Sequence, residues 1–240
     1  MTRGIDVSKH NGVIDWAKVR KNVDFAVIRA GYGKLISQKD VKFEKNYAGC
    51  KENSIPCGVY WYSYAHSVAE AQTEARVFLE AIKGKSFEYP VYLDFEEESQ
   101  FRLGKNMCSA MTEAFLKIVQ DAGYFVGIYS SKSGLENYID ASIRKKYSVW
   151  VAHVGVNKTS YSMPFDMWQY SWKGRIDGIS GDVDCNYAYK DFPAIIQGKG
   201  LNGFEKAVET VEKPVENPAA KGSFTIEIEG RIFRGTLYEE

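Results

Sequence analysis

The chain has 240 residues, of which 45% are hydrophobic and 26% charged, and its 31 basic and 31 acidic side chains leave no formal net charge. This composition is typical of a globular protein with one large domain or two small ones. The neutral balance gives no electrostatic argument for a nucleic-acid or membrane partner, and no apolar run approaches the roughly 20 residues that cross a bilayer.

Short β-rich runs alternate with helical patterns over residues 1–195. Strands are expected at residues 5–7, 25–30, 58–64, 91–95, 125–129, 149–152, 167–170 and 183–184. Helices are expected at residues 15–22, 41–53, 68–82 and 107–122, and residues 132–191 show little helical pattern. Runs such as FAVIRA and FVGIY are typical of strands buried on both faces. Eight strands that alternate with helices predict a parallel (β/α) barrel, with some helices reduced because about 250 residues is usual for that fold.

The C-terminal part of the chain has a different texture. Residues 196–222 read as a linker with a short helical pattern at 204–211, followed by a Pro-, Ala-, Lys- and Gly-rich stretch. Residues 223–240 contain FTIEIEGRIFRGTLY, two alternating runs around Glu229 and Gly230 that predict a β-hairpin. An isolated hairpin is marginally stable in water, so we expect it to pair with another chain or to dock on the barrel.

Acidic residues end the fourth expected strand, YPVYLDFEEES at residues 89–99. Alternate residues of a strand share a face, so Asp94 and Glu96 are predicted to point into the barrel at its C-terminal mouth, where such barrels hold their active sites. Glu97 and Glu98 are expected to be loop acids in water.

Two more acids lie at the strands that would close the barrel. Asp6 ends the first strand, and Asp184 is expected to end the last, which is its neighbour in a closed barrel. Four carboxyl groups from three strands would then face one cleft. Such crowding raises at least one pKa and supplies a protonated acid, as protonation of a glycosidic oxygen requires.

The chain resembles the glycoside hydrolase family 25 lysozymes, the Chalaropsis-type muramidases. The resemblance rests on GIDVSKHNGVIDWAKV, DFAVIRAGYG, PCGVYWYSYA, YPVYLDFEE, GIYSS, VWVAHV and MWQYS…DVDCN, in that order. It implies a modified (β/α) barrel that cleaves the β-1,4 bond between N-acetylmuramic acid and N-acetylglucosamine in peptidoglycan. Carried over by motif, Glu96 is the proton donor, and Asp94, Asp6 and Asp184 are the other acids of the site.

The roles of these three aspartates stay open in the sequence. Asp94 is either a nucleophile or the group that orients the 2-acetamido carbonyl of the substrate, and the D-x-E pattern favours the second route. Asp6 and Asp184 could instead hold strand ends or pair with Arg29.

Aromatic residues supply candidates for sugar binding. Tyr62, Tyr129 and Trp168 are expected to line the cleft, although core packing accounts equally well for any one of them. His153 is a further candidate, with a structural imidazole as the alternative. The histidines lack metal-ligand spacing, and we expect neither a metal nor a cofactor.

These observations predict a peptidoglycan hydrolase, with a non-catalytic wall-glycan-binding module as the alternative. The N-terminus, MTRGIDVSKHNG, contains no apolar signal core. A phage or prophage endolysin, made in the bacterial cytoplasm and released to the wall at lysis, is therefore expected, with a bacterial autolysin as the nearest variant. The expected partners are bacterial peptidoglycan and, through the hairpin, further copies of the chain.

Overall fold

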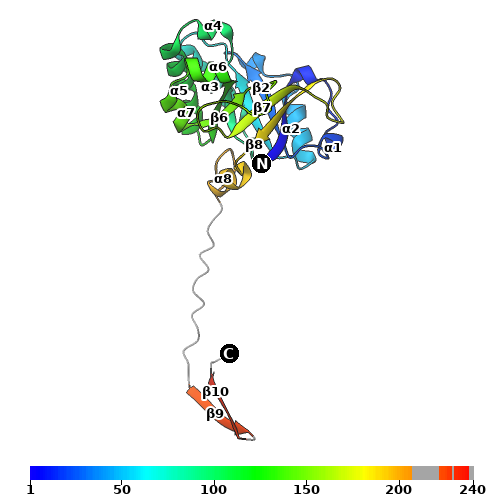
Figure 1. Ribbon diagram of the computed structural model, residues 1–240, viewed down its shortest axis with the longest axis vertical. Coiled ribbons are helices and arrows are strands. Elements are labelled where there is room, and N and C mark those ends of the chain that lie inside the picture. Colours follow the sequence, from blue (N-terminus) through cyan, green and yellow to red (C-terminus); the bar gives the residue numbers. More distant parts are fainter. Residues whose placement is uncertain (207–221, 229, 238–240) are drawn as a thin grey trace. The chain divides into compact units, whose positions relative to one another are not determined.

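The computed structural model describes residues 1–206, 222–228 and 230–237, which belong to two separate units. The first unit is a closed barrel of eight strands with helices around it (Figure 1). Its strands are β1 (Thr2–Val7), β2 (Phe25–Tyr32), β3 (Cys57–Tyr62), β4 (Val91–Asp94), β5 (Val126–Ser131), β6 (Ser148–Ala152), β7 (Met167–Gly174) and β8 (Val183–Ala188). All eight predicted strands are present.

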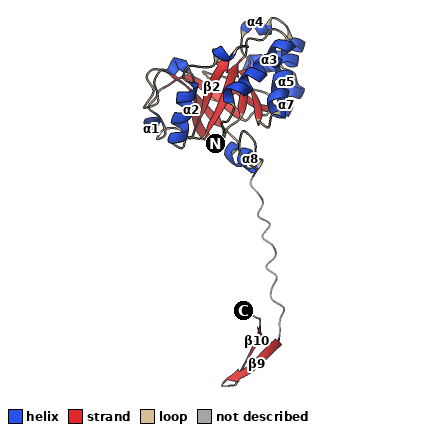
Figure 2. Cartoon of the chain, turned by 180° about the vertical axis from the view of Figure 1, so that it is seen from behind, coloured by secondary structure: helices blue, strands red, loops and turns tan. Residues whose placement is uncertain are grey.

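The helices of this unit vary widely in length. They are α1 (Trp16–Val19), α2 (Phe43–Glu52), α3 (Val68–Ile82), α4 (Glu98–Phe101), α5 (Lys105–Asp121), α6 (Lys132–Tyr138), α7 (Ala141–Lys146) and α8 (Phe192–Gly198), with 3-10 turns η1 (Lys9–Asn11) and η2 (Ile36–Gln38). Figure 2 shows α3, α5 and α7 on one side of the barrel strands and α1 and α2 on the opposite side. The short helices α4, α6, α7 and α8 lie outside the helices that the sequence predicts. Ser131 caps α6 by accepting a hydrogen bond from the amide of Gly134, a signal that the sequence did contain.

The last strand, β8, does not run parallel to its neighbours, although the sequence predicts a parallel barrel. Neighbouring strands from β1 to β7 run parallel, but β8 is antiparallel to both β7 and β1. The physical reason is the connection at residues 175–182, which is too short for the crossover of a dozen or more residues that a parallel neighbour needs. Asp184 therefore lies at the beginning of β8 rather than at its end. Because the strand is reversed, that beginning still lies at the mouth where β1 to β7 end.

Apolar side chains occupy two layers, one inside the barrel and one between the strands and the helices. Phe25, Tyr92, Trp150 and Met167 belong to the inner layer and are buried. The outer layer includes Trp61, whose ring packs on Phe78 of α3 at a centroid distance of 5.4 Å. Strand alternation produces both layers from the same sequences.

The end of the barrel opposite the mouth is closed by α8 and the residues that follow it. Phe192 is buried against the inner layer. The Asn202 amide is also buried; it donates to the carbonyls of Phe87 and Tyr89 and accepts from the amide of Phe125. The domain boundary expected at residue 195 thus falls inside α8, and residues through 204 pack with the barrel. Of the helix expected at 204–211, residues 204–206 are not helical, and the remainder lies outside the described residues.

The second unit is a two-stranded antiparallel sheet, as the sequence predicts. Strands β9 (Gly222–Ile228) and β10 (Arg231–Leu237) pair with Ile226 opposite Phe233 and Ile228 opposite Arg231. This register is the one that two residues between the strands allow.

A glycine inside the barrel provides a test of the packing. A Cβ atom at Gly127 of β5 would clash with the Tyr92 ring and lie 2.8 Å from the carbonyl oxygen of Ser148 on β6. We expect Gly127→Ala to lower the free energy of unfolding by about 1–3 kcal/mol in urea denaturation. The control is Gly198→Ala in α8, where a Cβ meets nothing within 4 Å and stability should hold or rise slightly. Equal effects of the two substitutions would contradict the packing described.

Candidate active site

The end of β4 directs its acids as strand alternation predicts. Leu93 and Phe95 point outward into the layer beneath the helices, and Tyr92 points inward and is fully buried. Asp94 is the last residue of β4, and its side chain lines a pocket at the mouth of the barrel. Glu96 lies two residues further on and lines the same pocket.

This pocket has a volume of about 330 Å³ and collects the predicted acids from separate strands. Asp6, Asp94, Glu96 and Asp184 all contribute to its wall, as do the predicted aromatic residues Tyr62 and Tyr129. The structure therefore brings together six of the eight residues singled out from the sequence.

Asp6 is the most firmly held of the four acids. Its Oδ2 accepts hydrogen bonds from Nδ2 of Asn186 at 2.8 Å and from Nε2 of Gln169 at 2.9 Å. Both amides are buried, so no water competes with these bonds. Burial raises the pKa of Asp6, and the two neutral donors on one oxygen oppose that rise because they favour the charged carboxylate.

The orientation of each amide is fixed by donors on its other side. Oδ1 of Asn186 accepts from Nε1 of Trp150 at 2.9 Å. Oε1 of Gln169 accepts from the Tyr129 hydroxyl at 2.8 Å and from Nε1 of Trp172 at 2.9 Å. An indole can only donate, so both amides must turn their NH₂ groups toward Asp6.

Asp184 faces Asp6 directly across the strand pair that closes the barrel. The two residues are register partners, and their carboxyl groups are hydrogen-bonded to each other. Burial and the negative charge of Asp6 raise the pKa of Asp184 to about 8. A bond between two carboxyl groups requires one proton, and the two amide donors on Asp6 favour the charge there and the proton on Asp184.

Asp94 has the least polar surroundings of the four acids. It is 4% exposed, and its Oδ1 is buried without a hydrogen bond to any residue that the structure describes. Burial, followed by the charges of Glu96 and Asp6, raises the pKa of this carboxyl well above its usual range. Asp94 is therefore held neutral unless a positive group or a further donor approaches it.

Glu96 combines access to solvent with a crowded setting. Its side chain is exposed at the pocket mouth, yet protein groups surround it closely enough to remove part of its hydration. This desolvation, followed by the charge of Asp6, raises the pKa of Glu96 to about 7, while the nearby Tyr129 opposes the shift. Glu96 can thus gain and lose a proton near neutral pH while in contact with a ligand in the pocket.

The two other acids of the fourth-strand segment have different environments. Glu98 is exposed in the first turn of α4, where it pairs with Arg102. Glu97 is half-buried, and its Oε2 accepts a hydrogen bond from the Tyr62 hydroxyl at 3.1 Å. The expectation that Glu97 is a loop acid in water is therefore wrong, because this bond ties the loop after β4 to the end of β3.

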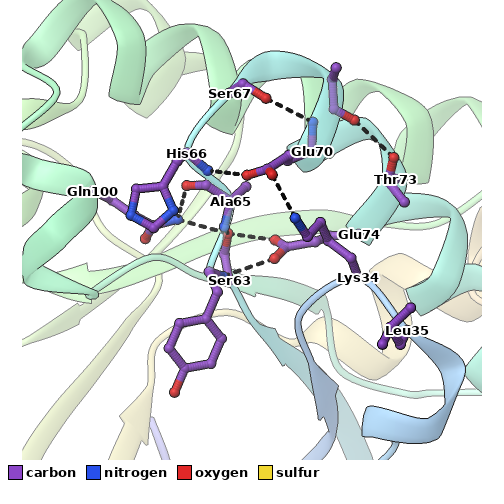
Figure 3. A network of polar contacts seen from close by, with 12 residues as sticks. Lys34, Leu35, Ser63, Ala65, His66, Ser67, Glu70, Thr73, Glu74 and Gln100 are labelled. Carbon is purple, nitrogen blue, oxygen red and sulfur yellow. Dashed lines mark hydrogen bonds and ion pairs between the residues drawn. The ribbon is translucent and has the colours of Figure 1, made fainter.

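A buried polar network supports the loops after β3 and β4 (Figure 3). Glu74 of α3 is fully buried and accepts from the Ser63 hydroxyl at 2.6 Å and from the Tyr64 amide at 2.9 Å. Nε2 of Gln100 in α4 donates to Ser63 Oγ and to the Ala65 carbonyl, each at 2.9 Å. The segment next to Tyr62 and the segment next to Glu96 are thereby fixed to each other.

A second cavity, of about 380 Å³, adjoins the acidic pocket and shares His10, Arg29 and Tyr62 with it. Arg29 contacts Asp40 through its Nε at 2.8 Å and its Nη2 at 2.7 Å. The alternative in which Asp6 or Asp184 pairs with Arg29 is therefore wrong. Lys9 also lines this cavity, which has no acidic residue in its wall.

Trp168 and His153 do not line the acidic pocket. Trp168 points outward from β7, where its ring packs near Tyr170, and its Nε1 donates to the His153 carbonyl at 3.0 Å. Nδ1 of His153 is hydrogen-bonded with the Thr159 hydroxyl. This contact corresponds to the alternative in which the His153 imidazole has a structural role. On β7 it is the next residue, Gln169, that faces the pocket.

Sequence reasoning missed Gln169, which donates to Asp6, and Trp150, which orients Asn186, and it gave Asn186 no role in holding Asp6. The signal for Gln169 was present, because strand alternation in MWQY puts Trp168 and Gln169 on opposite faces. The partnership of Trp150 with Asn186 depends on the closing of the barrel and leaves no local signal.

Comparisons with known proteins cover the same region. The sequence model of the family Glycosyl hydrolases family 25 matches residues 5–179. "Uncharacterized protein YegX" of Escherichia coli O157:H7 is 32% identical over 190 residues, which are 76% of this chain and 68% of that protein. "Lysozyme M1" of Streptomyces globisporus is 30% identical over 204 residues, 77% of this chain and 66% of that protein. The crystal structure of a bacterial lysozyme from Streptomyces coelicolor aligns with a TM-score of 0.70 at 29% identity, over 79% of this chain and 92% of that chain.

The buried carboxyl of Asp94 makes stability depend on pH. Its pKa is raised in the folded chain, so folding favours the protonated form, and this contribution is lost as the pH rises above the ordinary aspartate value. We expect Asp94→Asn to raise the free energy of unfolding at pH 8 by more than about 1 kcal/mol, and by less at pH 5. Urea denaturation at both pH values measures this difference.

The control for this prediction is Asp177→Asn, which changes an exposed aspartate in the loop between β7 and β8. Its stability should match that of the parent at both pH values. A gain for Asp94→Asn that is equal at pH 5 and pH 8 would show that removal of the buried charge is not the cause.

Proposed function

The chain belongs to glycosyl hydrolase family 25, and from this premise we propose that it is a lysozyme that hydrolyses the β-1,4 bond between N-acetylmuramic acid and N-acetylglucosamine in peptidoglycan. The observation that carries the proposal is the pocket in which four carboxyl groups meet with different proton affinities. Glycosidic bond cleavage needs one carboxyl that can donate a proton near neutral pH, beside others that stay charged or hold the substrate. Bacterial peptidoglycan is then the partner and the cell wall the place of action.

Glu96 is proposed as the general acid and base. It protonates the leaving glycosidic oxygen and then removes a proton from the attacking water. Its exposure at the pocket mouth and its pKa of about 7 support this role, because the other acids are either deeper or engaged with each other. Partial loss of hydration, followed by the negative charge of Asp6, keeps the pKa of Glu96 raised.

Asp94 is proposed to orient the 2-acetamido group so that its carbonyl oxygen attacks the anomeric carbon. The Asp94 carboxyl is enclosed at the end of β4, and one of its oxygens has no hydrogen-bond partner among the described residues. An acetamido N–H in the pocket would supply that partner and favour the charged form of Asp94. Detection of a glycosyl ester on Asp94 would show that it acts as the nucleophile instead.

A non-catalytic module on the same barrel is not favoured. Burying several acids that raise one another's pKa destabilises a fold, and glycan binding alone does not require them. Within the residues that the structure describes, no helix combines the length and the apolar character that crossing a membrane demands.

Substitution of the proposed acid gives the direct test of catalysis. Glu96→Gln keeps the shape of the side chain but cannot deliver a proton, so we expect kcat on purified peptidoglycan to fall by about 10²- to 10⁴-fold. Release of reducing ends measures the rate.

The matched control is Glu98→Gln, two residues along, where the side chain is exposed and paired with Arg102. This variant should retain the parental rate. Parental activity of Glu96→Gln would refute the assignment of Glu96, whereas an inactive parent would refute the hydrolase proposal as a whole.

We also propose that the C-terminal hairpin joins copies of this chain. Because strand residues alternate, one face of the hairpin is mainly apolar: it carries Phe224, Ile226, Ile228, Phe233 and Leu237, all between 39% and 56% exposed, with Arg231 beside Ile228. The other face is mainly polar: it carries Ser223, Thr225, Glu227, Arg234 and Thr236, together with Ile232. The Phe224 ring lies over Gly235, its partner on the neighbouring strand. A second copy presents the same apolar face and two further unpaired strand edges, which makes it the simplest occupant.

Light scattering tests this association. The full chain is expected to be a dimer or larger, and Phe233→Ser, as well as a chain ending at residue 206, is expected to be monomeric. The control is Arg234→Ser, which changes the neighbouring residue on the polar face and should leave the mass unchanged. A monomeric parent would refute the proposal.

A further inference from the structure

Trp172 differs from the other tryptophans of the chain in its exposure. Its side chain is 57% exposed, whereas Trp16, Trp61, Trp150 and Trp168 are each 7% exposed or less. Leaving so large an apolar ring in water contributes nothing to folding. The position of this ring therefore calls for another explanation.

The Trp172 ring is held in one orientation despite its exposure. Nε1 donates to Oε1 of Gln169 at 2.9 Å, and Gln169 is only 1% exposed. Gln169 in turn is held by the Tyr129 hydroxyl and by Asp6. The indole edge is thus anchored to a fixed group, and much of the ring surface stays open.

An irregularity in β7 brings this residue back toward the pocket. The pairing of β7 with β8 shifts register between Gln169 and Ser171 and again between Ser171 and Gly174. Such bulges turn side chains away from simple alternation. Gln169 lines the acidic pocket and Trp172 does not, so this hydrogen bond holds the Trp172 indole beside the pocket, against a residue of its wall.

We propose that Trp172 is a stacking platform for one pyranose ring of the glycan, beside the sugars that flank the cleaved bond. Sugar rings present an apolar C–H face that packs on an indole, and a ring already fixed in position loses little entropy on binding. The proposal rests on the glycan hydrolase function above and adds a specificity-determining residue to it.

The hydrogen bonds around Gln169 predict which kinetic constant responds. Without the indole, Oε1 of Gln169 still accepts from Tyr129, and Nε2 still donates to Asp6. The catalytic acids should therefore keep their arrangement when Trp172 is replaced. Loss of the platform weakens glycan binding and leaves the chemical step in place.

Kinetics on soluble glycan strands from peptidoglycan test this separation. We expect Trp172→Ala to raise KM about three- to tenfold, with kcat within twofold of the parent. Trp172→Phe keeps a ring without the N–H group, so its KM should stay closer to the parental value. The control is Tyr189→Ala, which removes an exposed aromatic side chain just beyond β8, at the barrel end opposite the mouth, and should change neither constant. An unchanged KM for Trp172→Ala, or a fall in kcat alone, would overturn the proposal.

Fluorescence quenching by iodide gives a measurement that does not depend on turnover. Iodide should quench mainly Trp172, because the other four indoles are buried, and Trp172→Phe should lose this quenching. Added glycan strands should protect Trp172 of the parent from iodide. If the strands bind but leave the quenching unchanged, the platform is refuted. If the strands protect Trp172 but are not cleaved, the platform stands and the hydrolase function fails.

Discussion

One buried carboxylate, Asp6, connects the closing of the barrel with the formation of the pocket. Its Oδ2 accepts from an amide on β7 and an amide on β8, while Asp6 itself belongs to β1. These three strands form the seam where the barrel closes, and β8 enters it in the reverse direction. A charge buried at this place is tolerated because both amides are oriented by donors of their own: Trp150 orients Asn186, and the Tyr129 hydroxyl orients Gln169, with Trp172 as a second donor to Gln169. The seam and the acid site are therefore one structure, and a change in either affects both.

The acids differ in proton affinity because their partners differ. Amide donors favour the charge on Asp6, that charge keeps a proton on Asp184, and the lack of any donor on Oδ1 of Asp94 favours its neutral form. Glu96, the most exposed of the four, loses part of its hydration and lies near the charge of Asp6, so its pKa is about 7. The arrangement opposes stability, since each group would ionise more easily in the unfolded chain. Such a cluster of acids is retained where a site needs a carboxyl group that can donate its proton near neutral pH, as glycoside hydrolysis requires.

The sequence determines the parts of this structure that depend on local periodicity. Alternation along YPVYLDFEE correctly predicts the inward direction of Asp94, and eight apolar runs correctly predict eight strands. The reversal of β8 is missed because it follows from the length of one connection, which the strand pattern does not show. The residue type makes Trp168 a candidate for sugar binding, but its side chain faces outward, and Gln169 lines the pocket instead. The roles of Trp150 and Gln100 arise from contacts between distant segments, so no local pattern reveals them.

The surroundings of the acids differ in character on the two sides of the pocket. On the β3 side, the Tyr62 hydroxyl holds Glu97, and the buried Glu74 network fixes the backbone behind it. On the β7 side, the register shift places an indole whose edge is anchored and whose surface is open. A hydrogen-bonded polar wall and an open aromatic surface suit a ligand with hydroxyl groups on its edges and C–H groups on its faces. A sugar chain has that alternation, and neither a flat aromatic ligand nor a simple ion has it. The pocket rim thus points to a glycan independently of the acids, because it rests on different residues and different forces.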